Sequence, residues 1–270
     1  MRTWLAWFLA LGLAGCDRPT HGPKLEPAAS PEKVVVARPT AEPSAAAQTT
    51  PVVVELFSSE GCSSCPPADV LLSELSAKQG VKGANVIALE LHVDYWDDLG
   101  WADPFSSAAF SARQRSYASA ASRRGAFTPE AVVDGGASVV GSDTTALSAE
   151  VEHAASRPHL AVALTARSDG ALDAVAERAP SAAASYWLAI TESGLQTKVK
   201  AGENRGQTLR HAPVVRSLTR VGSATAAPSR IELPAVRSAS GELTAVVFIQ
   251  QDADLAIVGA NTLPLTRAPG

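Results

Sequence analysis

The sequence predicts an α/β domain followed by an all-β domain, and three observations support this fold class. Residues 51–157 alternate strand-like and helix-like segments in the order β-α-β-α-β-β-α. A Cys-x-x-Cys pair, Cys62 and Cys65, stands where the first of these strands passes into the first helix. Residues 158–265 contain strand-like segments spaced about 8 to 12 residues apart, which predicts an antiparallel sandwich or barrel.

The first three elements of the α/β region form a β-α-β unit. "VVVELF" at 52–57 is a short β-branched run typical of a buried strand. The segment 68–80 has Leu71 and Leu75 on one helical face and ends in glycine, which predicts a helix. "NVIALELHVDYW" at 85–96 is the second expected strand. A helix between two strands predicts that they are parallel, with a right-handed crossover.

The rest of the α/β region contains two more helices and a hairpin. A second helix is expected over 106–124, with Ser106 or Ser107 as its N-cap. The Asp-Gly-Gly sequence at 134–136 separates two short apolar runs and predicts a hairpin turn. A third helix is expected over 142–157, begun by a serine or aspartate cap.

The N-terminus is typical of an export signal. "MRTWLAWFLALGLAGC" has one arginine, an apolar run over 4–14 and small residues before Cys16. This run is short for a bilayer span. "LAGC" resembles the lipobox of bacterial lipoproteins, which implies that 1–16 is a lipoprotein signal and that Cys16 is lipidated. An ordinary signal peptide with an incidental cysteine is the alternative. By the sorting rule of enteric bacteria, Asp17 would favour the inner membrane.

Composition limits the remaining function classes. Residues 17–50 are rich in proline and alanine and lack an apolar period, so we expect a disordered tether. The whole chain has 23 basic and 27 acidic residues and no basic block, which argues against nucleic-acid binding. We therefore expect a protein facing the periplasm of the bacterial cell envelope, anchored to the membrane by lipid.

The pair Cys62 and Cys65 has three interpretations. Assigning Cys16 to lipid leaves these two cysteines as the one remaining pair in an exported chain, where disulfides persist. A redox centre is the first interpretation and a permanent structural disulfide is the second. The third is a copper or zinc site, with His92 as the nearest further ligand. We predict the redox centre, with no metal and no cofactor.

Position on a helix suggests separate roles for the two cysteines. A cysteine at the open end of a helix lies near unpaired backbone N–H groups and the positive end of the helix dipole, which stabilise a thiolate. We therefore expect Cys62 to be the exposed nucleophile. Cys65, one turn further, would resolve the mixed disulfide.

The element order, the cysteine pair and a proline directly before the third strand together resemble the thioredoxin fold. The proline is Pro129, preceded by Thr128. The resemblance implies that Pro129 is a cis-proline. It also implies that Thr128 presents its backbone to an incoming polypeptide beside the nucleophilic sulfur.

A second resemblance rests on three longer stretches, "VVVELFSSEGCSSCPPAD", "LHVDYWDDLGWADPF" and "GENRGQTLRHAPVVRSL". They are similar to a bacterial family of secreted, thioredoxin-like proteins of unknown function that share the Cys-x-x-Cys and His-Val-Asp-Tyr-Trp motifs. The resemblance covers about 51–262. Because the ends of parallel strands meet at one edge, we expect His92, Asp94, Tyr95 and Trp96 to wall the redox site. The alternative is that this run only pins its own loop.

These observations favour an envelope thiol–disulfide oxidoreductase whose partners are protein thiols or disulfides. Two alternatives stay open. One is an envelope binding or assembly protein that uses the domain as a scaffold. The other is a copper-handling protein that uses Cys62, Cys65 and His92. No catalytic motif is evident in the all-β region.

Overall fold

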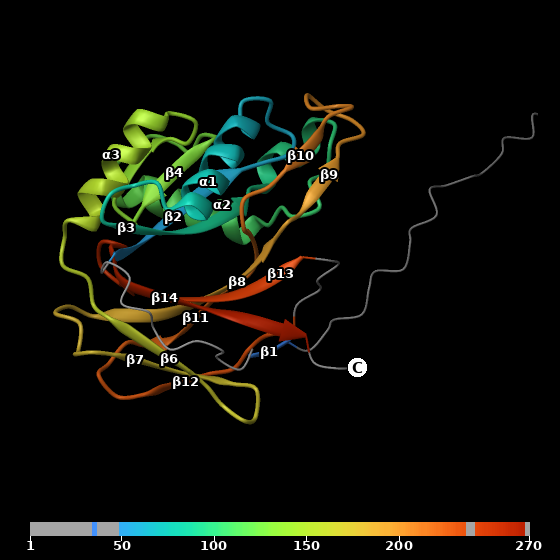
Figure 1. Ribbon diagram of the computed structural model, residues 1–270. Helices are drawn as coiled ribbons and strands as arrows, with labels where there is room; N and C mark the ends of the chain where they lie inside the picture. Colours follow the sequence, from blue (N-terminus) through green and yellow to red (C-terminus); the bar gives the residue numbers. More distant parts are fainter. Residues whose placement is uncertain (1–33, 37–48, 236–240, 268–270) are drawn as a thin grey trace, which may run out of the picture.

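A computed structural model describes residues 34–36, 49–235 and 241–267. Helices and strands alternate in the first half, and strands dominate the second (Figure 1). The helices are α1 (Pro66–Lys78), the 3₁₀ helix η1 (Asp94–Leu99), α2 (Ala108–Ala120) and α3 (Thr144–Ala155). The strands are β1 (Val34–Val36), β2 (Thr50–Ser58), β3 (Ala84–His92), β4 (Glu130–Val133), β5 (Ala137–Val140), β6 (Val162–Ala166), β7 (Leu172–Ala176), β8 (Ala184–Ser193), β9 (Gln196–Lys198), β10 (Thr208–Arg210), β11 (Val214–Ser223), β12 (Ser229–Ile231), β13 (Glu242–Gln251) and β14 (Ile257–Arg267).

One large mixed sheet runs through both halves of the chain. Its nine strands lie in the order β1-β14-β13-β8-β11-β3-β2-β4-β5. As expected, β2 and β3 are parallel, and the hairpin β4–β5 adds antiparallel to β2. The C-terminal strands join at β3, where Val214 of β11 pairs in parallel with Glu90. Smaller sheets consist of β9–β10 and of β12-β7-β6.

The continuity of this sheet corrects the expected fold class. The longest strands of the C-terminal half extend the same sheet as β2 and β3, and the described strands form no closed barrel. The fold is therefore mixed α/β with one large mixed sheet. Pairing with β11 covers an edge of β3 that would otherwise present unpaired backbone groups. The division into domains at residue 157 stays a prediction.

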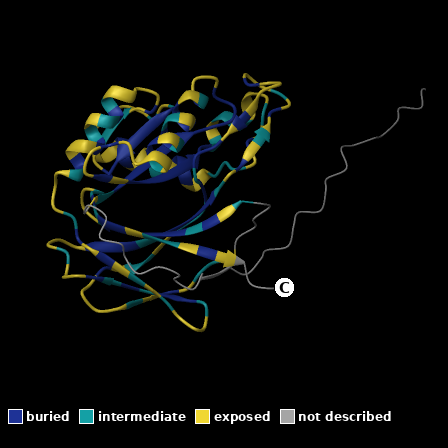
Figure 2. Ribbon diagram, in the orientation of Figure 1, coloured by how far each residue is buried: buried dark blue, intermediate teal, exposed yellow. Residues whose placement is uncertain are grey.

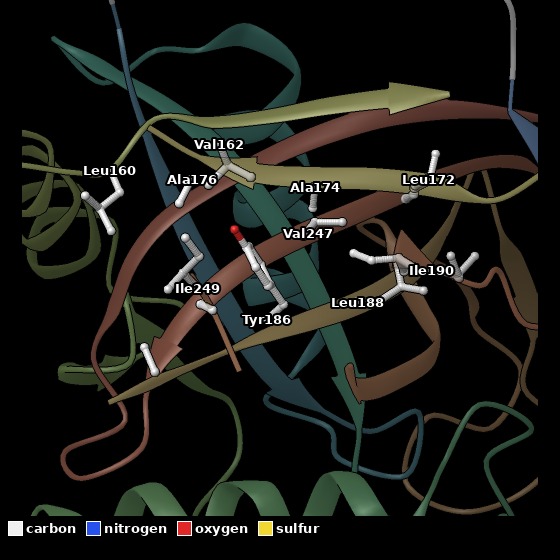
Figure 3. Packing of buried hydrophobic residues seen from close by; sticks show 14 of the residues in the cluster. Leu160, Val162, Leu172, Ala174, Ala176, Tyr186, Leu188, Ile190, Val247 and Ile249 are labelled. Carbon is white, nitrogen blue, oxygen red and sulfur yellow. The ribbon is translucent and has the colours of Figure 1, made fainter. Parts of the chain in front are cut away.

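Three hydrophobic clusters hold the layers together. One lies between α1, α3 and the strands β2, β3 and β4. A second joins α2 and the other face of β2 and β3 to side chains of β8 and β13. The third packs the small β12-β7-β6 sheet onto β8 and β13, around Tyr186 (Figure 3). Strands β2 and β3 are buried almost throughout, while the outer faces of the helices are exposed (Figure 2).

Local sequence signals set several element boundaries. Ser107 caps α2 by accepting a hydrogen bond from the N–H of Ala109, and Asp143 caps α3 in the same manner. The turn at 134–136 has Gly135 at φ 68°, where an added Cβ would lie 1.9 Å from the carbonyl oxygen of Leu255. Only glycine suits this position, so the hairpin signal also carries a tertiary constraint.

The second expected strand is shorter than its apolar pattern suggests. It ends at His92, and 94–99 form the 3₁₀ helix η1. The N–H of Asp94 donates to Ser111 Oγ on α2, at 3.0 Å, and the Asp94 carboxylate accepts from the same hydroxyl. Side-chain hydrogen bonding of this kind competes with strand pairing and turns the chain toward α2.

Candidate functional site

The two cysteines form a disulfide in the loop between β2 and α1. Cys62 and Cys65 are bonded, with their Cα atoms 5.5 Å apart. Cys65 is the N-cap of α1, and its carbonyl oxygen accepts from the N–H of Ala68 at 2.8 Å. Pro66 and Pro67 fill the first helical positions, where a missing N–H leaves no bond unmade. The pair therefore begins the helix as the sequence predicted.

The expected exposure of Cys62 is wrong in this structure. Both Cys62 and Cys65 have 0% exposure, although Ser63 and Ser64 between them are exposed. The sulfur of Cys62 lies 3.4 Å from Ser64 Oγ. The disulfide thus lies just beneath the surface, and a reaction partner must displace neighbouring groups to reach it.

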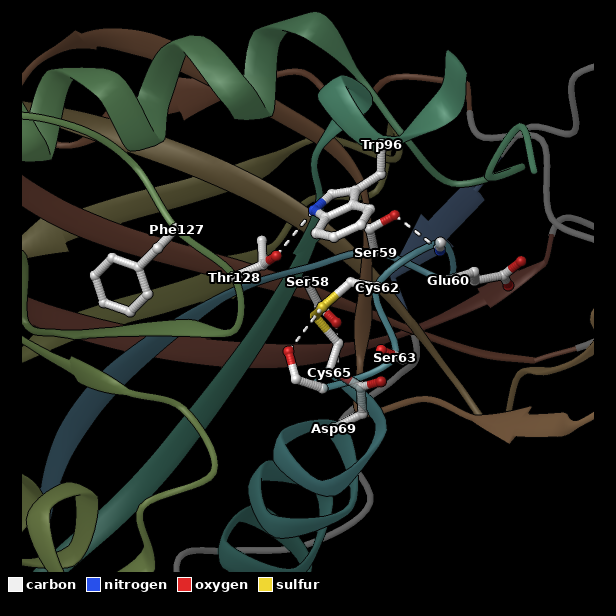
Figure 4. The surroundings of a disulfide bond; sticks show 12 residues. Ser58, Ser59, Glu60, Cys62, Ser63, Cys65, Asp69, Trp96, Phe127 and Thr128 are labelled. Carbon is white, nitrogen blue, oxygen red and sulfur yellow. Dashed lines mark hydrogen bonds between the residues drawn. A yellow bond between two sulfur atoms is a disulfide. The ribbon is translucent and has the colours of Figure 1, made fainter. Parts of the chain in front are cut away.

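Trp96 and Thr128 meet beside the disulfide. The Thr128–Pro129 peptide bond is cis, as the resemblance implied. Trp96 Nε1 donates to Thr128 Oγ1 at 2.9 Å, which joins η1 to the loop before β4 close to Cys62 (Figure 4). A Cβ at Gly61 would lie 3.2 Å from the Trp96 Cβ, so this glycine lets the tryptophan approach the cysteine loop.

Asp69 is a buried carboxyl group in the first turn of α1. It is 2% exposed, stands four residues after Cys65 and donates its backbone N–H to the Cys65 carbonyl at 3.2 Å. Ser58 Oγ donates to its carboxylate at 2.7 Å. Burial, together with the negative charge of Glu90, raises the pKa of Asp69 well above its usual value. Asp69 can therefore hold a proton below the disulfide (Figure 4).

A chain of five buried ionisable side chains lies behind the cysteine loop. His92 Nδ1 contacts Asp103 at 2.7 Å, and His92 Nε2 contacts Glu90 Oε1 at 2.8 Å. His211 Nδ1 contacts the same Glu90 oxygen at 3.2 Å, and His211 Nε2 contacts Glu60 at 3.1 Å. The order is thus Asp103, His92, Glu90, His211, Glu60, which we call the His/Glu cluster.

Mutual contact sets the charges of the His/Glu cluster. Burial would lower the pKa of His92, but Asp103 and Glu90 raise it well above its usual value. Burial acts likewise on His211, whose hydrogen bonds to Glu60 and Glu90 raise its pKa to about 9. Burial would raise the pKa values of Glu90 and Asp103, yet the histidines lower both. Carboxylates and imidazolium rings stabilise one another there.

The C-terminal half holds the cysteine loop in place, which the sequence did not reveal. Asn204 Nδ2 donates to the carbonyl oxygens of Glu60, at 2.9 Å, and of Cys62, at 3.0 Å. Glu203 accepts from the N–H of Ser63 at 3.0 Å. With His211, these residues lie in the stretch 202–218 that carried part of the family resemblance. That resemblance was the one available signal for them.

The four expected wall residues separate into three places. Trp96 lies at the disulfide, and His92 lies in the His/Glu cluster. Asp94 bonds Ser111 on α2, which is the contact of a residue that pins a loop. The Tyr95 hydroxyl donates to Gln114 Oε1 on α2 at 3.1 Å and also interacts with Thr128, so Tyr95 lies between α2 and the loop before β4.

Two further expectations concern the N-terminal segments and attachment to the membrane. Cys16, the signal segment and most of the tether 17–50 lie outside the described residues. None of the described helices is long and apolar enough to cross a bilayer.

Comparisons with known proteins place the chain beside others of similar fold. A family model described as "Protein of unknown function (DUF1223)" matches residues 53–250. The crystal structure of an Agrobacterium tumefaciens protein, solved as a structural genomics target, is 28% identical and superposes with a TM-score of 0.64. That match covers 81% of this chain and 96% of the other. No protein with a curated description matches the chain.

Proposed function

The chain belongs to the DUF1223 family, and we propose that it is a thiol–disulfide oxidoreductase of the bacterial cell envelope. The observation that carries the proposal is the Cys62–Cys65 disulfide at the start of α1. The strand order β3-β2-β4-β5, with α1 and α3 packed on one face and α2 on the other, supports a thioredoxin-like arrangement for this part of the chain.

The proposed exchange uses both sulfurs. A substrate thiolate attacks the sulfur of Cys62, the disulfide breaks, and its electron pair passes to Cys65. A second substrate thiolate then attacks the substrate sulfur of the mixed disulfide, and Cys62 leaves as a thiolate. The substrate dithiol becomes a disulfide and the protein pair becomes a dithiol. The reverse sequence reduces a substrate disulfide.

Asp69 is positioned to exchange a proton with Cys65. When Cys65 leaves as a thiolate in a buried position, an unprotonated sulfur is disfavoured there. Asp69 holds its proton because burial raises its pKa, and it stands one helical turn from Cys65. We assign it as the group that gives this proton and takes it back on reoxidation.

Access to Cys62 requires movement of its cover. Trp96 lies beside Cys62 and bonds Thr128 (Figure 4), so we propose that an incoming polypeptide displaces the indole and pairs with the Thr128 backbone. The substrate class is therefore an extended peptide segment bearing a cysteine. Attachment through lipidated Cys16 would hold this reaction at the membrane surface.

Complete burial of the disulfide favours a second candidate function. A pair at 0% exposure in a cysteine loop fixed by Asn204 is also what an inert structural disulfide would show. The protein would then be a binding or assembly scaffold of the envelope. The two candidates differ in whether the pair reacts while the protein stays folded.

The decisive experiment combines a redox titration with trapping. The full chain is equilibrated in glutathione buffers, and its free thiols are counted after alkylation while near-ultraviolet circular dichroism reports folding. We expect the pair to be reduced and reoxidised reversibly in the folded protein. Cys65→Ser should accumulate mixed disulfides with envelope proteins, and Cys62→Ser should not. A pair that reacts only after unfolding would favour the scaffold.

A further inference from the structure

Two histidine rings and one carboxylate converge inside the His/Glu cluster. His92 Nε2 and His211 Nδ1 both point to Glu90 Oε1, at 2.8 and 3.2 Å. One donor atom from each of these three residues lies within 4.8 Å of the others. Two imidazole nitrogens and a carboxylate oxygen form a donor set that first-row divalent cations accept. A small movement of each side chain would bring the three donors around one ion.

The outer contacts of both rings are those of metal-binding histidines. His92 Nδ1 lies 2.7 Å from Asp103, and His211 Nε2 lies 3.1 Å from Glu60. In metal sites the ring nitrogen away from the ion usually donates its N–H to a carboxylate, which fixes the tautomer and the ring orientation. In both rings here, one nitrogen contacts Glu90 and the other contacts a second carboxylate, which is Asp103 for His92 and Glu60 for His211.

Glu90 supplies an independent observation. Its second oxygen, Oε2, is buried and has no hydrogen-bond partner in the described structure. Buried carboxylate oxygens without partners are rare in folded proteins. A cation held by both carboxylate oxygens of Glu90 and by the two rings would have four ligand atoms, which is the usual number for Zn²⁺.

The charge of the His/Glu cluster also suits a cation. The cluster contains three carboxylates and two imidazole rings, so it carries excess negative charge even when both rings are protonated. His211 also lines a cavity of about 400 Å³ between α1, β3 and β8. Polar side chains, among them Ser73, Gln79 and Asn85, line the same cavity. The His211 side chain itself is fully buried, so an ion reaches the ring from this cavity only when neighbouring groups move.

We propose that Glu90, His92 and His211 form a binding site for a divalent first-row transition cation of the Zn²⁺ class, oriented by Asp103 and Glu60. The site is distinct from the cysteine pair, whose sulfurs are bonded to each other. It also differs from a copper site built on Cys62 and Cys65, because it needs no thiolate. The proposal holds whether or not the disulfide is redox-active.

The first test uses the wild-type full chain with its disulfide intact. The protein is stripped with a chelator, passed through a desalting column, incubated with Zn²⁺ and desalted again. We expect about one Zn²⁺ per chain by elemental analysis, together with a higher melting temperature. With Co²⁺ as the probe, we expect visible d–d bands without the near-ultraviolet charge-transfer band that a thiolate ligand would add.

The second test assigns the ligands. His211→Gln and Glu90→Gln should each lower Zn²⁺ affinity by more than about 100-fold, because removing even a hydrogen-bond partner of a ligand typically costs about 10- to 100-fold. His159→Gln is the matched control, because His159 is also a ring bonded to a buried carboxylate, Asp134, at 2.9 Å. It should bind Zn²⁺ like the wild type.

Three results would overturn the proposal. The first is a wild-type protein that binds no Zn²⁺ and gives no Co²⁺ bands while its disulfide is intact; the cluster would then be held by protons alone. The second is undiminished binding by both ligand variants. The third is Co²⁺ spectra with thiolate bands, which would place the ion on Cys62 and Cys65. The wild-type measurements decide the matter even if a cluster variant fails to fold.

Discussion

At the scale of single residues, Asp69 is the group whose burial is hardest to explain by stability. Its one side-chain hydrogen bond in the described contacts comes from Ser58, and Glu90 adds repulsion. A carboxyl group whose pKa is raised on folding contributes stability that is fully present below its unfolded pKa, about 4, and is lost as pH rises through the folded value. At neutral pH, Asp69 therefore opposes folding.

The first prediction is that Asp69→Asn stabilises the protein and slows its chemistry. Asparagine keeps the acceptor for Ser58 and removes the buried titration, so the free energy of unfolding at pH 7 should rise and the gain should vanish near pH 4. Thiol–disulfide exchange should slow by about 100-fold, the usual lower effect of a lost general acid. Urea unfolding and the rate of reoxidation after reduction measure the two effects.

Asp94→Asn is the matched control for this prediction. Asp94 bonds Ser111 at the start of η1, away from the sulfur pair, so its loss should lower stability by about 1 kcal/mol and leave the exchange rate unchanged. A reoxidation rate that Asp69→Asn leaves untouched would remove Asp69 from the proposed mechanism.

At the scale of elements, the contact between η1 and the loop before β4 is the gate that we propose for the disulfide. The second prediction concerns the hydrogen bond from Trp96 to Thr128 in this contact. Trp96→Phe keeps the ring and removes the donor, and Thr128→Val keeps the shape and removes the acceptor. Each substitution should make the closed arrangement less stable by about 1 kcal/mol. The folded protein should then react with dithiothreitol roughly fivefold faster.

The double variant distinguishes a gate from a general loss of stability. Since both substitutions break the same bond, their effects on the reduction rate should not add. Ser185→Ala, which removes a hydrogen bond to Asp252 in the C-terminal half, serves as control. Fully additive effects, or equal acceleration in the control, would contradict gating by Trp96.

The third prediction concerns the hairpin β4–β5 and its contact with His159. Burial would lower the pKa of His159, but its hydrogen bond to Asp134 raises it. Because the folded pKa is raised, the stabilisation is fully present below about pH 6.5 and is lost as pH rises through the folded value. His159→Gln should therefore destabilise by about 1 to 2 kcal/mol at pH 6 and by less at pH 9.

Urea unfolding of wild type and His159→Gln at several pH values measures this difference directly. Subtracting the unfolding free energy of the variant from that of the wild type at each pH removes the contributions of His92 and His211, whose pKa values are also raised. His153→Gln, at an exposed histidine of α3, is the control substitution. A difference that stays constant from pH 6 to 9 would mean that His159 does not carry the charge.

At the scale of the whole molecule, local signals predict the elements but not how the two halves combine. Turn and cap residues such as Ser107 and Asp143 act within a few positions, so helices and the hairpin could be inferred from the sequence. The parallel pairing of Val214 with Glu90 joins residues far apart in the chain, and no local pattern encodes it. The sheet that unites the halves was therefore missed.

The candidate site divides in the same way. Cys62, Cys65 and Pro129 could be inferred because spacing and element order carry the information. The His/Glu cluster could not, because its contacts join β3, the loop after η1 and the segment before β11. One clue was present, since Glu90 lies in a largely apolar strand, where a buried carboxylate needs partners. That His211 would be a partner of Glu90 could not be inferred from the sequence.

The last prediction is that residues 49–157 do not fold alone. Without the C-terminal half, Leu89 and Phe57 lose their packing against Phe248, and β3 loses its pairing with β11. Glu60 loses its histidine partner His211 and Glu90 keeps only His92, and removal of one partner from a buried pair destabilises by about 3 to 5 kcal/mol. That loss is comparable to the whole stability of a small domain. We expect the fragment to bind a hydrophobic dye and to melt without a cooperative transition, and co-expression with residues 158–270 should restore a cooperative complex. A fragment that alone gives a dispersed NMR spectrum would instead establish residues 49–157 as an independent domain, with the C-terminal strands as an accessory.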